Sequence, residues 1–294
     1  MMTEPASAWA AVVINYRSGA ILTDCVTALR ADTSAGAAEI VIVDNGSDDG
    51  SVDALRLVWP EVTVLVPGSN LGYARAANLG IAATTAPIVG VINPDAIIEA
   101  GTAGTILGVF AAEGAVAVVG PHIVNPDGSV YPSARTAPGV GVALGHAVFG
   151  GLAPRNRFTR AYRQLDADPE TARDVDWVSG AALWLRRDSL DAVGGWDERY
   201  FLFLEDVDVC REIRHTGQRI RYEPAARVMH VVGTSRAERP MRSIVVHHRA
   251  AYRYLEKWWT GPKRWALPLA AGFLSVRAAI LVGASRIAGR HRLA

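Results

Sequence analysis

Short runs of apolar, β-branched residues alternate with helix-like segments along the first 120 residues, and this alternation constrains the fold most strongly. It is typical of parallel strands joined by helical crossovers. We therefore predict an α/β fold with a mainly parallel, twisted sheet flanked by helices. The predicted strands are Ala10–Ile14, Ile40–Val43, Val62–Val66, Ile88–Ile92 and Val116–Val119, and the predicted helices are Ile21–Arg30, Val52–Val58, Tyr73–Ala83 and Thr102–Ala112.

The alternation is lost after residue 120, and no element is predicted with defined bounds between Asn125 and Asp176. Ordered elements resume beyond this stretch. They are a strand Val178–Leu185, a helix Glu205–His215 ended by Gly217, and short strands Ile220–Tyr222 and Arg227–Val231. The last section predicts an aromatic and basic helix over Ser243–Trp259, followed by an apolar run over Trp265–Ala284.

Charge is distributed unevenly along the chain, although its formal net charge is only +1. Residues 1–235 carry 18 basic and 27 acidic side chains, whereas residues 236–294 carry 12 basic and 2 acidic ones. We predict a catalytic domain over 1–235 and a basic, amphipathic helical region over 236–294. Such a region suits an anionic surface, either lipid or nucleic acid. No nucleic-acid module is recognised, so we expect membrane contact and no nucleic-acid partner.

The apolar run 265–284 is interrupted by Pro268, Gly272 and Arg277. A spanning helix with a central arginine is costly, so an interfacial helix is favoured, with packing of both C-terminal helices on the body as the alternative. Cys25 and Cys210 have no CxxC partner, which favours a reducing compartment. The N-terminus lacks a basic region and a long apolar run. We expect a cytoplasmic protein peripheral to the membrane.

A polar segment beginning at Asp44 directly follows a predicted buried strand and precedes a helix. Ligands of open α/β sheets bind outside the carboxyl ends of the strands. Asp44 can therefore accept a hydrogen bond from a nucleobase or bind a ribose. A capped turn between strand and helix explains the same residues equally well.

Asn93-Pro94-Asp95 follows another apolar strand, where proline fixes the backbone and makes Asp95 project rigidly. A hard divalent cation that bridges a diphosphate needs such an oxygen ligand. One carboxylate is a weak metal signal by itself, and a simple turn is the alternative.

Three acidic residues, Glu205, Asp206 and Asp208, begin the later helix after an aromatic run. Acidic residues are ordinarily favourable in a first helical turn. Apolar surroundings can also raise the pKa of one carboxyl group and make it a general base. His230 follows a predicted strand and is a possible metal ligand, although a lone histidine is more often a packed or surface residue.

Taken together and in this order, the segments resemble glycosyltransferase family 2, whose members have the GT-A fold. The resemblance covers roughly residues 9 to 234. The matching segments are Val12–Tyr16, Val43–Ser51, Asn70–Asn78, Asn93–Asp95, Ser179–Ala181, Gly194–Asp197 and Phe203–Asp206.

This resemblance implies an inverting transfer of a sugar from a nucleotide donor and assigns roles to matching residues. Asp206, with Glu205, corresponds to the catalytic base. Asp95 and His230 correspond to ligands of Mg²⁺ or Mn²⁺, although Asn93 replaces the first Asp of the family's Asp-x-Asp motif. The nucleotide-sugar-binding positions are Tyr16, Asp44, Asn45, Gly72, Arg75, Asn78, Asn93 and Asp95.

Within the family, the Asn-Tyr opening, the Asn-Pro-Asp segment and the basic tail resemble actinobacterial rhamnosyltransferases. These use dTDP-L-rhamnose and act on N-acetylglucosaminyl-diphospho-polyprenol, the arabinogalactan linker of the cell wall. Transfer of galactofuranose, mannose or another sugar is the nearest alternative. A nicotinamide-dependent oxidoreductase lacks support because no G-x-G-x-x-G follows the first strand. A non-catalytic scaffold is a distant alternative. The sequence does not determine the oligomeric state.

Overall fold

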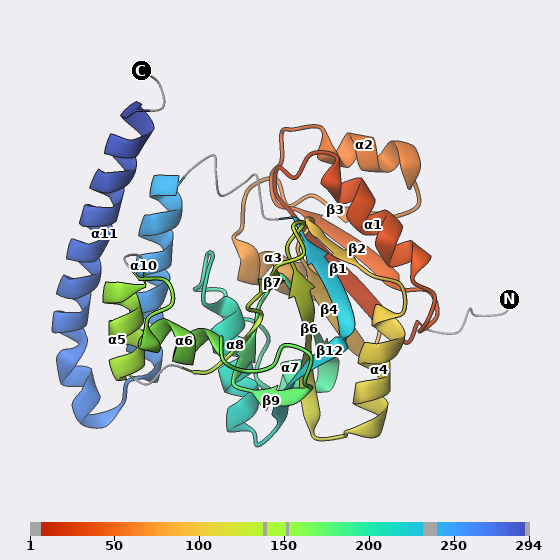
Figure 1. Cartoon of the computed structure of the whole chain (residues 1–294). Coiled ribbons are helices and arrows are strands. Elements are labelled where there is room, and N and C mark those ends of the chain that lie inside the picture. Colours follow the sequence, from red (N-terminus) through yellow and green to blue (C-terminus); the bar gives the residue numbers. More distant parts are fainter. Residues whose placement is uncertain (1–6, 138–139, 151–152, 232–239, 292–294) are drawn as a thin grey trace, which may run out of the picture.

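A ten-stranded sheet forms the centre of the molecule, and a pair of long helices stands beside it (Figure 1). The computed structural model describes residues 7–137, 140–150, 153–231 and 240–291. The strands are β1 Trp9–Asn15, β2 Glu39–Asp44, β3 Thr63–Leu65, β4 Ile88–Ile92, β5 Ala96–Ile98, β6 Val116–Val124, β7 Val130–Tyr131, β8 Ala134–Arg135, β9 Arg173–Val175, β10 Trp177–Val178, β11 Ala182–Arg186 and β12 Arg219–His230. The helices are α1 Ile21–Ala31, α2 Ser51–Val58, α3 Tyr73–Ala82, α4 Thr102–Ala112, α5 Val140–Phe149, α6 Arg157–Arg163, α7 Arg187–Ala192, α8 Glu205–His215, α10 Pro240–Trp258, η1 Gly261–Ala266 and α11 Leu267–His291.

The main sheet has the order β3-β2-β1-β4-β11-β6-β12-β5. The strands from β3 to β4 are all parallel, as the sequence predicts. Strand β11 runs antiparallel to both of its neighbours, β4 and β6, and therefore makes the sheet mixed. The predicted helix-flanked α/β fold is confirmed: β1, β2, β3, β4, β6 and β12 run in one direction, and the antiparallel strands are β11 within the sheet and β5, β7 and β9 on its far side.

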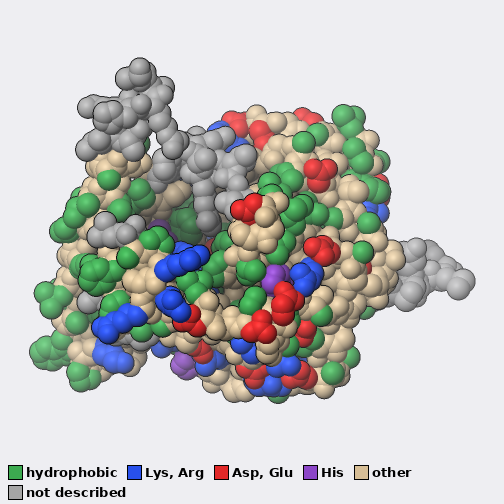
Figure 2. All heavy atoms as spheres, viewed as in Figure 1, with side chains coloured by type: hydrophobic (Ala, Val, Ile, Leu, Met, Phe, Trp, Pro, Cys, Tyr) green, Lys and Arg blue, Asp and Glu red, His purple; other side chains and the backbone are tan. Residues whose placement is uncertain are grey.

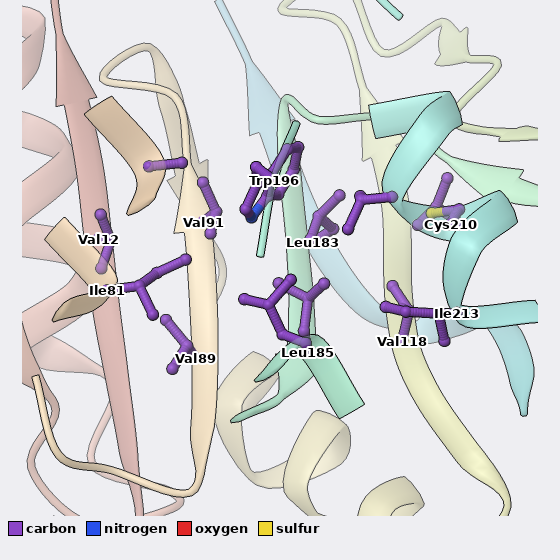
Figure 3. Close-up of a cluster of buried hydrophobic side chains, with 14 of the residues drawn as sticks. Val12, Ile81, Val89, Val91, Val118, Leu183, Leu185, Trp196, Cys210 and Ile213 are labelled. Atoms are coloured by element: carbon purple, nitrogen blue, oxygen red, sulfur yellow. The ribbon is translucent and has the colours of Figure 1, made fainter. Parts of the chain in front are cut away.

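Apolar side chains cover both faces of the sheet, because successive side chains of a strand point to opposite faces. One cluster lies between the sheet and α3, α7 and α8, and includes Leu183, Cys210 and Ile213 (Figure 3). The other lies against α1, α2 and α4 and includes Cys25 and Trp184. The two thiols are free and buried on opposite faces. This packing fixes the edge of the sheet that carries the polar loops.

The predicted strand Val178–Leu185 is wrong as a single element. It is divided into β10, which pairs with β8 in a small separate sheet, and β11 in the main sheet. The break falls at Ser179–Ala181, whose backbone groups bond to other parts of the chain. The two predicted short strands near the end are one strand, β12, with a register shift between Glu223 and Arg227. The segment without predicted elements contains β7, β8, α5, α6 and β9.

The C-terminal region forms two helices that lie side by side, α10 and α11 (Figure 1). Helix α10 packs on α8, where Arg211 donates to Tyr254 Oη at 2.9 Å. The packing alternative is therefore correct for α10. Helix α11 is the outer of the two and leaves one apolar side exposed. The predicted domain boundary at Ser235 and the N-terminal residues 1–6 lie outside the described residues.

Candidate active site

Polar side chains at the ends of β1 and β2 form a buried network. Asn15 and Asp44 are paired in register, and Asn15 Nδ2 donates to Asp44 Oδ1 at 2.9 Å. The same nitrogen lies 3.1 Å from Ser47 Oγ and 3.0 Å from Ser51 Oγ. Tyr16 is half-buried beside this network. These bonds fix the Asp44 carboxylate at the edge of the sheet where ligands bind in such folds.

Asn45 connects this network to the loop before α3. Its side chain accepts from Leu71 N at 2.7 Å and donates to Gly72 O at 3.1 Å. Gly72 has a φ of +84°, and a Cβ there would lie 2.5 Å from Phe201 O. Only glycine fits this close approach, in which Tyr73 N donates to Phe201 O at 2.7 Å. Asn45 and Gly72 therefore hold two loops together, and their contact with a nucleotide stays a prediction.

Arg75 and Asn78 point toward the turn that contains the Gly-Gly-Trp sequence. Arg75 Nε pairs with Glu198 Oε2 at 3.0 Å, and both side chains are about half exposed. The Asn78 amide accepts from Trp196 N and donates to Trp196 O, each at 2.9 Å. These contacts give Asn78 a positioning role in the turn. The predicted contact of both residues with a nucleotide stays a prediction.

Asp95 and His230 form a pair from distant parts of the chain. His230 Nε2 lies 3.1 Å from Asp95 Oδ1, and Val231 N donates to Asp95 O at 2.8 Å. The His230 ring is buried and packs edge-on against Tyr131 at a centroid distance of 5.5 Å, and its Nδ1 has no hydrogen-bond partner within the described ranges. Two ligand atoms at this separation fit adjacent positions around a cation with bonds of about 2.0–2.2 Å.

No group of three or more His, Cys, Asp or Glu side chains able to hold a metal occurs within the described ranges. Asp95 and His230 thus fit a cation that takes its remaining ligands from phosphate and water.

The break between β10 and β11 forms hydrogen bonds with three other segments of the site, those that contain Asn93, Tyr73 and Asp206. Ala181 O accepts from Asn93 N at 2.8 Å. Gly180 N donates to Asp206 Oδ2 at 2.8 Å, and Tyr73 Oη donates to Gly180 O at 2.7 Å. The segment that carries Asp95 and the helix that carries Asp206 therefore meet at one corner. A Cβ on Gly180 would lie 3.4 Å from Asp206 Oδ2, so this corner is closely fitted to the carboxylate.

The Asp206 carboxyl group has the electrostatics of a general base. Burial raises its pKa, although the Gly180 N–H and the positive charge of Arg135 act in the opposite direction. A carboxylate with a raised pKa is a stronger base while it stays ionised. Tyr73 lies close to the same charges: burial and then Glu205, Asp206 and Asp95 raise the pKa of its phenol. The negative charges of Glu205, Asp206 and Asp95 therefore all act on the Tyr73 hydroxyl group.

An unusual backbone turn places α8. Phe203 and Leu204 both have left-handed φ angles, +72° and +64°, immediately before the buried Glu205. Residues in this region cost free energy, and such costs are concentrated at functional sites. Asp208, two residues beyond Asp206, points instead toward α10, where it accepts from Lys257 Nζ at 2.6 Å. Of the acidic residues that begin the helix, Asp208 therefore serves packing.

Two residues beside the site were missed in the sequence, Tyr73 and Arg135. Tyr73 lies inside the segment Asn70–Asn78, but nothing in that segment distinguishes its hydroxyl group from a packed aromatic ring. Arg135 lies in the stretch for which no elements were predicted, so its place beside Asp206 had no sequence signal.

The model of Glycosyl transferase family 2 matches residues 10–194. The chain belongs to this family. It is 36% identical over 296 residues to the N-acetylglucosaminyl-diphospho-decaprenol L-rhamnosyltransferase of Mycobacterium tuberculosis, and the match covers 96% of this chain and 95% of that one. The pre-mycofactocin glycosyltransferase of the same organism is 31% identical over 225 residues, which are 74% of this chain and 42% of that one.

Solved structures with the same fold include GalNAc-T7 with UDP, GalNAc and Mn²⁺, at a TM-score of 0.61 and 13% identity, covering 89% of this chain and 50% of that one. The mannosyltransferase PcManGT from Pyrobaculum calidifontis, in complex with GDP-Man and Mn²⁺, has a TM-score of 0.57 and 18% identity, covering 97% and 76%. At these identities the likeness concerns the fold, and it confirms the predicted GT-A type. The protein is a family 2 glycosyltransferase with Asp44, Asp95 and Asp206 on one edge of its sheet.

Proposed function

We propose that this glycosyltransferase moves L-rhamnose from dTDP-L-rhamnose to N-acetylglucosamine carried on a polyprenyl diphosphate, with inversion at the anomeric carbon. The observation that carries the proposal is the 36% identity over nearly all of both chains to a relative named for that acceptor and that sugar. Transfer of galactofuranose or mannose to the same acceptor is the nearest alternative.

Asp206 is the base in this proposal. It removes the proton of an acceptor hydroxyl group, the hydroxyl oxygen forms the new bond to the anomeric carbon, and the bond from that carbon to the nucleoside diphosphate breaks on the opposite face. The proton stays on Asp206 until product leaves. The raised pKa and the fixed hydrogen bond from Gly180 support this role, because they give a basic carboxylate held in one orientation.

Asp95 and His230 would hold Mg²⁺ or Mn²⁺ together with the donor diphosphate. When bound, the cation neutralises negative charge on the leaving group. Asn93 fixes the strand end through its backbone bond to Ala181, which supports a positioning role although it cannot supply a second carboxylate. Asp44 and Tyr16 are proposed to contact the nucleoside, because they lie at the neighbouring strand ends.

The test is a transfer assay with purified protein, short-chain N-acetylglucosaminyl-diphospho-prenol and a panel of dTDP-, UDP- and GDP-sugars, read by mass spectrometry. We expect a product that gains one deoxyhexose from dTDP-rhamnose alone, loss of activity with EDTA, and recovery with Mg²⁺ or Mn²⁺. Transfer from another donor would reject rhamnose and keep the mechanism. No transfer to this acceptor from any donor would reject the proposal.

Membrane contact is the second part of the proposal. Residues 261–286 are long and apolar enough to cross a membrane by length and composition, and an 18-residue window within them has a mean hydropathy of 1.8. Arg277, however, faces inward: its Nε donates to Ala147 O at 2.8 Å and its Nη1 lies 2.7 Å from His248 Nε2. The opposite side is apolar and exposed, as Figure 2 shows along the outer edge formed by α11; its exposed residues are Trp265, Leu269, Phe273, Val276 and Ile280. This geometry supports a helix that lies in the interface, at the cytoplasmic side, where basic residues meet anionic lipid.

Replacing Leu269 and Val276 together by Glu is expected to abolish flotation with vesicles that contain anionic lipid, while transfer to a short-chain acceptor in solution is kept. The physical reason is that two carboxylates on this face oppose both burial in the interface and attraction to the anionic surface. Leu57→Glu is the matched control, because Leu57 is 87% exposed on α2, far from α11 in sequence. Unchanged flotation of the double variant would reject this surface.

A further inference from the structure

Two arginines, Arg135 on β8 and Arg163 at the end of α6, have no acidic partner of their own in the part of the chain that the structure describes. Across the described residues, neither Arg135 nor Arg163 has a carboxylate within the 4.0 Å of an ion pair. Arg160, one turn earlier than Arg163 on α6, is in contrast paired with Asp166. Arg163 Nε is buried and has no hydrogen-bond partner among the described residues. Buried cationic groups without a counter-charge are costly, which points to a ligand that completes them.

The Arg135 guanidinium group is held in place by aromatic rings, and its charge acts on Arg163. The Arg135 guanidinium lies 4.8 Å from the centroid of Trp177, 5.7 Å from that of Tyr162 and 5.9 Å from that of Tyr131. Burial, and then repulsion from Arg135, lower the pKa of Arg163. Two cations whose charges act on each other form a site that suits a ligand with more than one negative charge.

The positive charges of Arg135 and Arg163 also act on α5, and Arg277 on α11 adds a third positive charge. Burial lowers the pKa of His146, and three arginines lower it further: Arg163, Arg135 and Arg277. His146 Nδ1 lies 2.9 Å from Thr159 Oγ1, so its ring is fixed as well. Figure 2 shows Lys and Arg side chains gathered on this face over α5 and α6. Positive charge from three separate elements therefore meets at one place.

The arginine cluster lies between the two surfaces that would meet the ends of a lipid-linked acceptor, one for its sugar and one for its lipid. On one side is Asp206, where burial raises the pKa and the charge of Arg135 partly offsets that rise. On the other side is α11, where Arg277 bonds to Ala147 O at the inner face and apolar residues cover the outer face. In such an acceptor the diphosphate joins the sugar to the lipid, so it must lie between the catalytic base and the apolar surface.

We propose that Arg135 and Arg163 bind the diphosphate of the lipid-linked acceptor and thereby place the acceptor sugar against Asp206. This inference rests on the acceptor class proposed above. The donor also carries a diphosphate, but its predicted ligands are Asp95 and His230, and among the described residues neither is a hydrogen-bond or ion-pair partner of Arg163. The experiment below distinguishes binding of the acceptor diphosphate from binding of the donor diphosphate.

The experiment measures binding by titration calorimetry on the full chain, using farnesyl diphosphate, farnesyl monophosphate, farnesol and dTDP. We expect wild type to prefer farnesyl diphosphate, and Arg163→Met to weaken that binding about 10–100-fold, the loss that corresponds to a charge-assisted hydrogen bond. Arg163→Met should bind dTDP as wild type does. Arg160→Met, on the same helix, is the matched control and should leave both affinities unchanged.

Equal affinity of wild type and Arg163→Met for farnesyl diphosphate would overturn the inference, as would no binding by wild type. Weaker binding of dTDP by the same factor would assign the arginine to the donor and also overturn it. These ligands carry no sugar, so the binding result does not depend on whether the proposed donor and acceptor sugars are correct. Conversely, a negative binding result would reject the role of the arginines without changing the outcome of the transfer assay. Melting temperatures of both variants exclude misfolding.

Discussion

Replacement of Asp206 by Asn is expected to lower kcat about 10²–10⁴-fold, the usual contribution of a general base. The amide oxygen of Asn can still accept the hydrogen bond that Gly180 N donates at 2.8 Å, so the corner between β10 and β11 keeps its shape, and only the bond from Val207 N to the second carboxylate oxygen is lost. An amide cannot remove a proton from an acceptor hydroxyl group. The melting temperature and the dissociation constant for the donor should therefore stay close to those of wild type.

The pH profile of kcat/KM provides a second readout of the same change. Because burial raises the pKa of Asp206, wild-type activity should rise as the pH rises through a pKa above the ordinary value of Asp, as the carboxyl group loses its proton. The residual activity of the variant should not show this rise with pH. Asp191→Asn, an exposed change on α7, is the control and should keep both the wild-type kcat and the rise with pH. A variant that retains wild-type kcat would remove Asp206 from the mechanism.

Much of the site could be predicted from the sequence because of where apolar strands end. Asp44 and Asp95 each follow a buried strand directly, and β1, β2 and β4 are parallel neighbours, so their carboxyl ends share one edge. The local sequence pattern was therefore enough to predict that Asp44 and Asp95 lie at the same edge of the sheet. The same argument did not reveal β11, whose antiparallel insertion between β4 and β6 depends on pairing with strands far away in the chain.

The roles of Asp206 and Asp208 could not be separated from the sequence. Both lie in the first turn of α8, and two residues along a helix of 3.6 residues per turn place side chains on nearly opposite sides. One side must face the active site and the other α10, and the sequence contains no local sign of which is which. The partner on α10 is 49 residues away, so only tertiary packing decides.

Asp208 and Lys257 form a buried ion pair that connects α8 to α10. Asp208 is 1% exposed and accepts from Lys257 Nζ at 2.6 Å and from Trp258 Nε1 at 2.7 Å. Lys257 also lies 3.1 Å from Asp197 and 2.9 Å from Glu212. Burial raises the pKa of Asp208 despite these donors. Burial would lower the pKa of Lys257, but its bonds to three carboxylates raise it instead. The buried carboxylate thus depends on this one ammonium group for its charge balance.

Lys257→Met is therefore expected to lower the free energy of unfolding by about 3–5 kcal/mol, the cost of leaving one member of a buried ion pair without its partner. At roughly 2–4 °C per kcal/mol, the melting temperature should fall by about 6–20 °C in a calorimetric scan. Lys263→Met is the matched control, since Lys263 is exposed on η1, and should change the melting temperature little. Adding Asp208→Asn to Lys257→Met removes the unpaired buried charge and should recover part of the loss. If the double variant were instead less stable than Lys257→Met, packing rather than charge would hold α10 on α8.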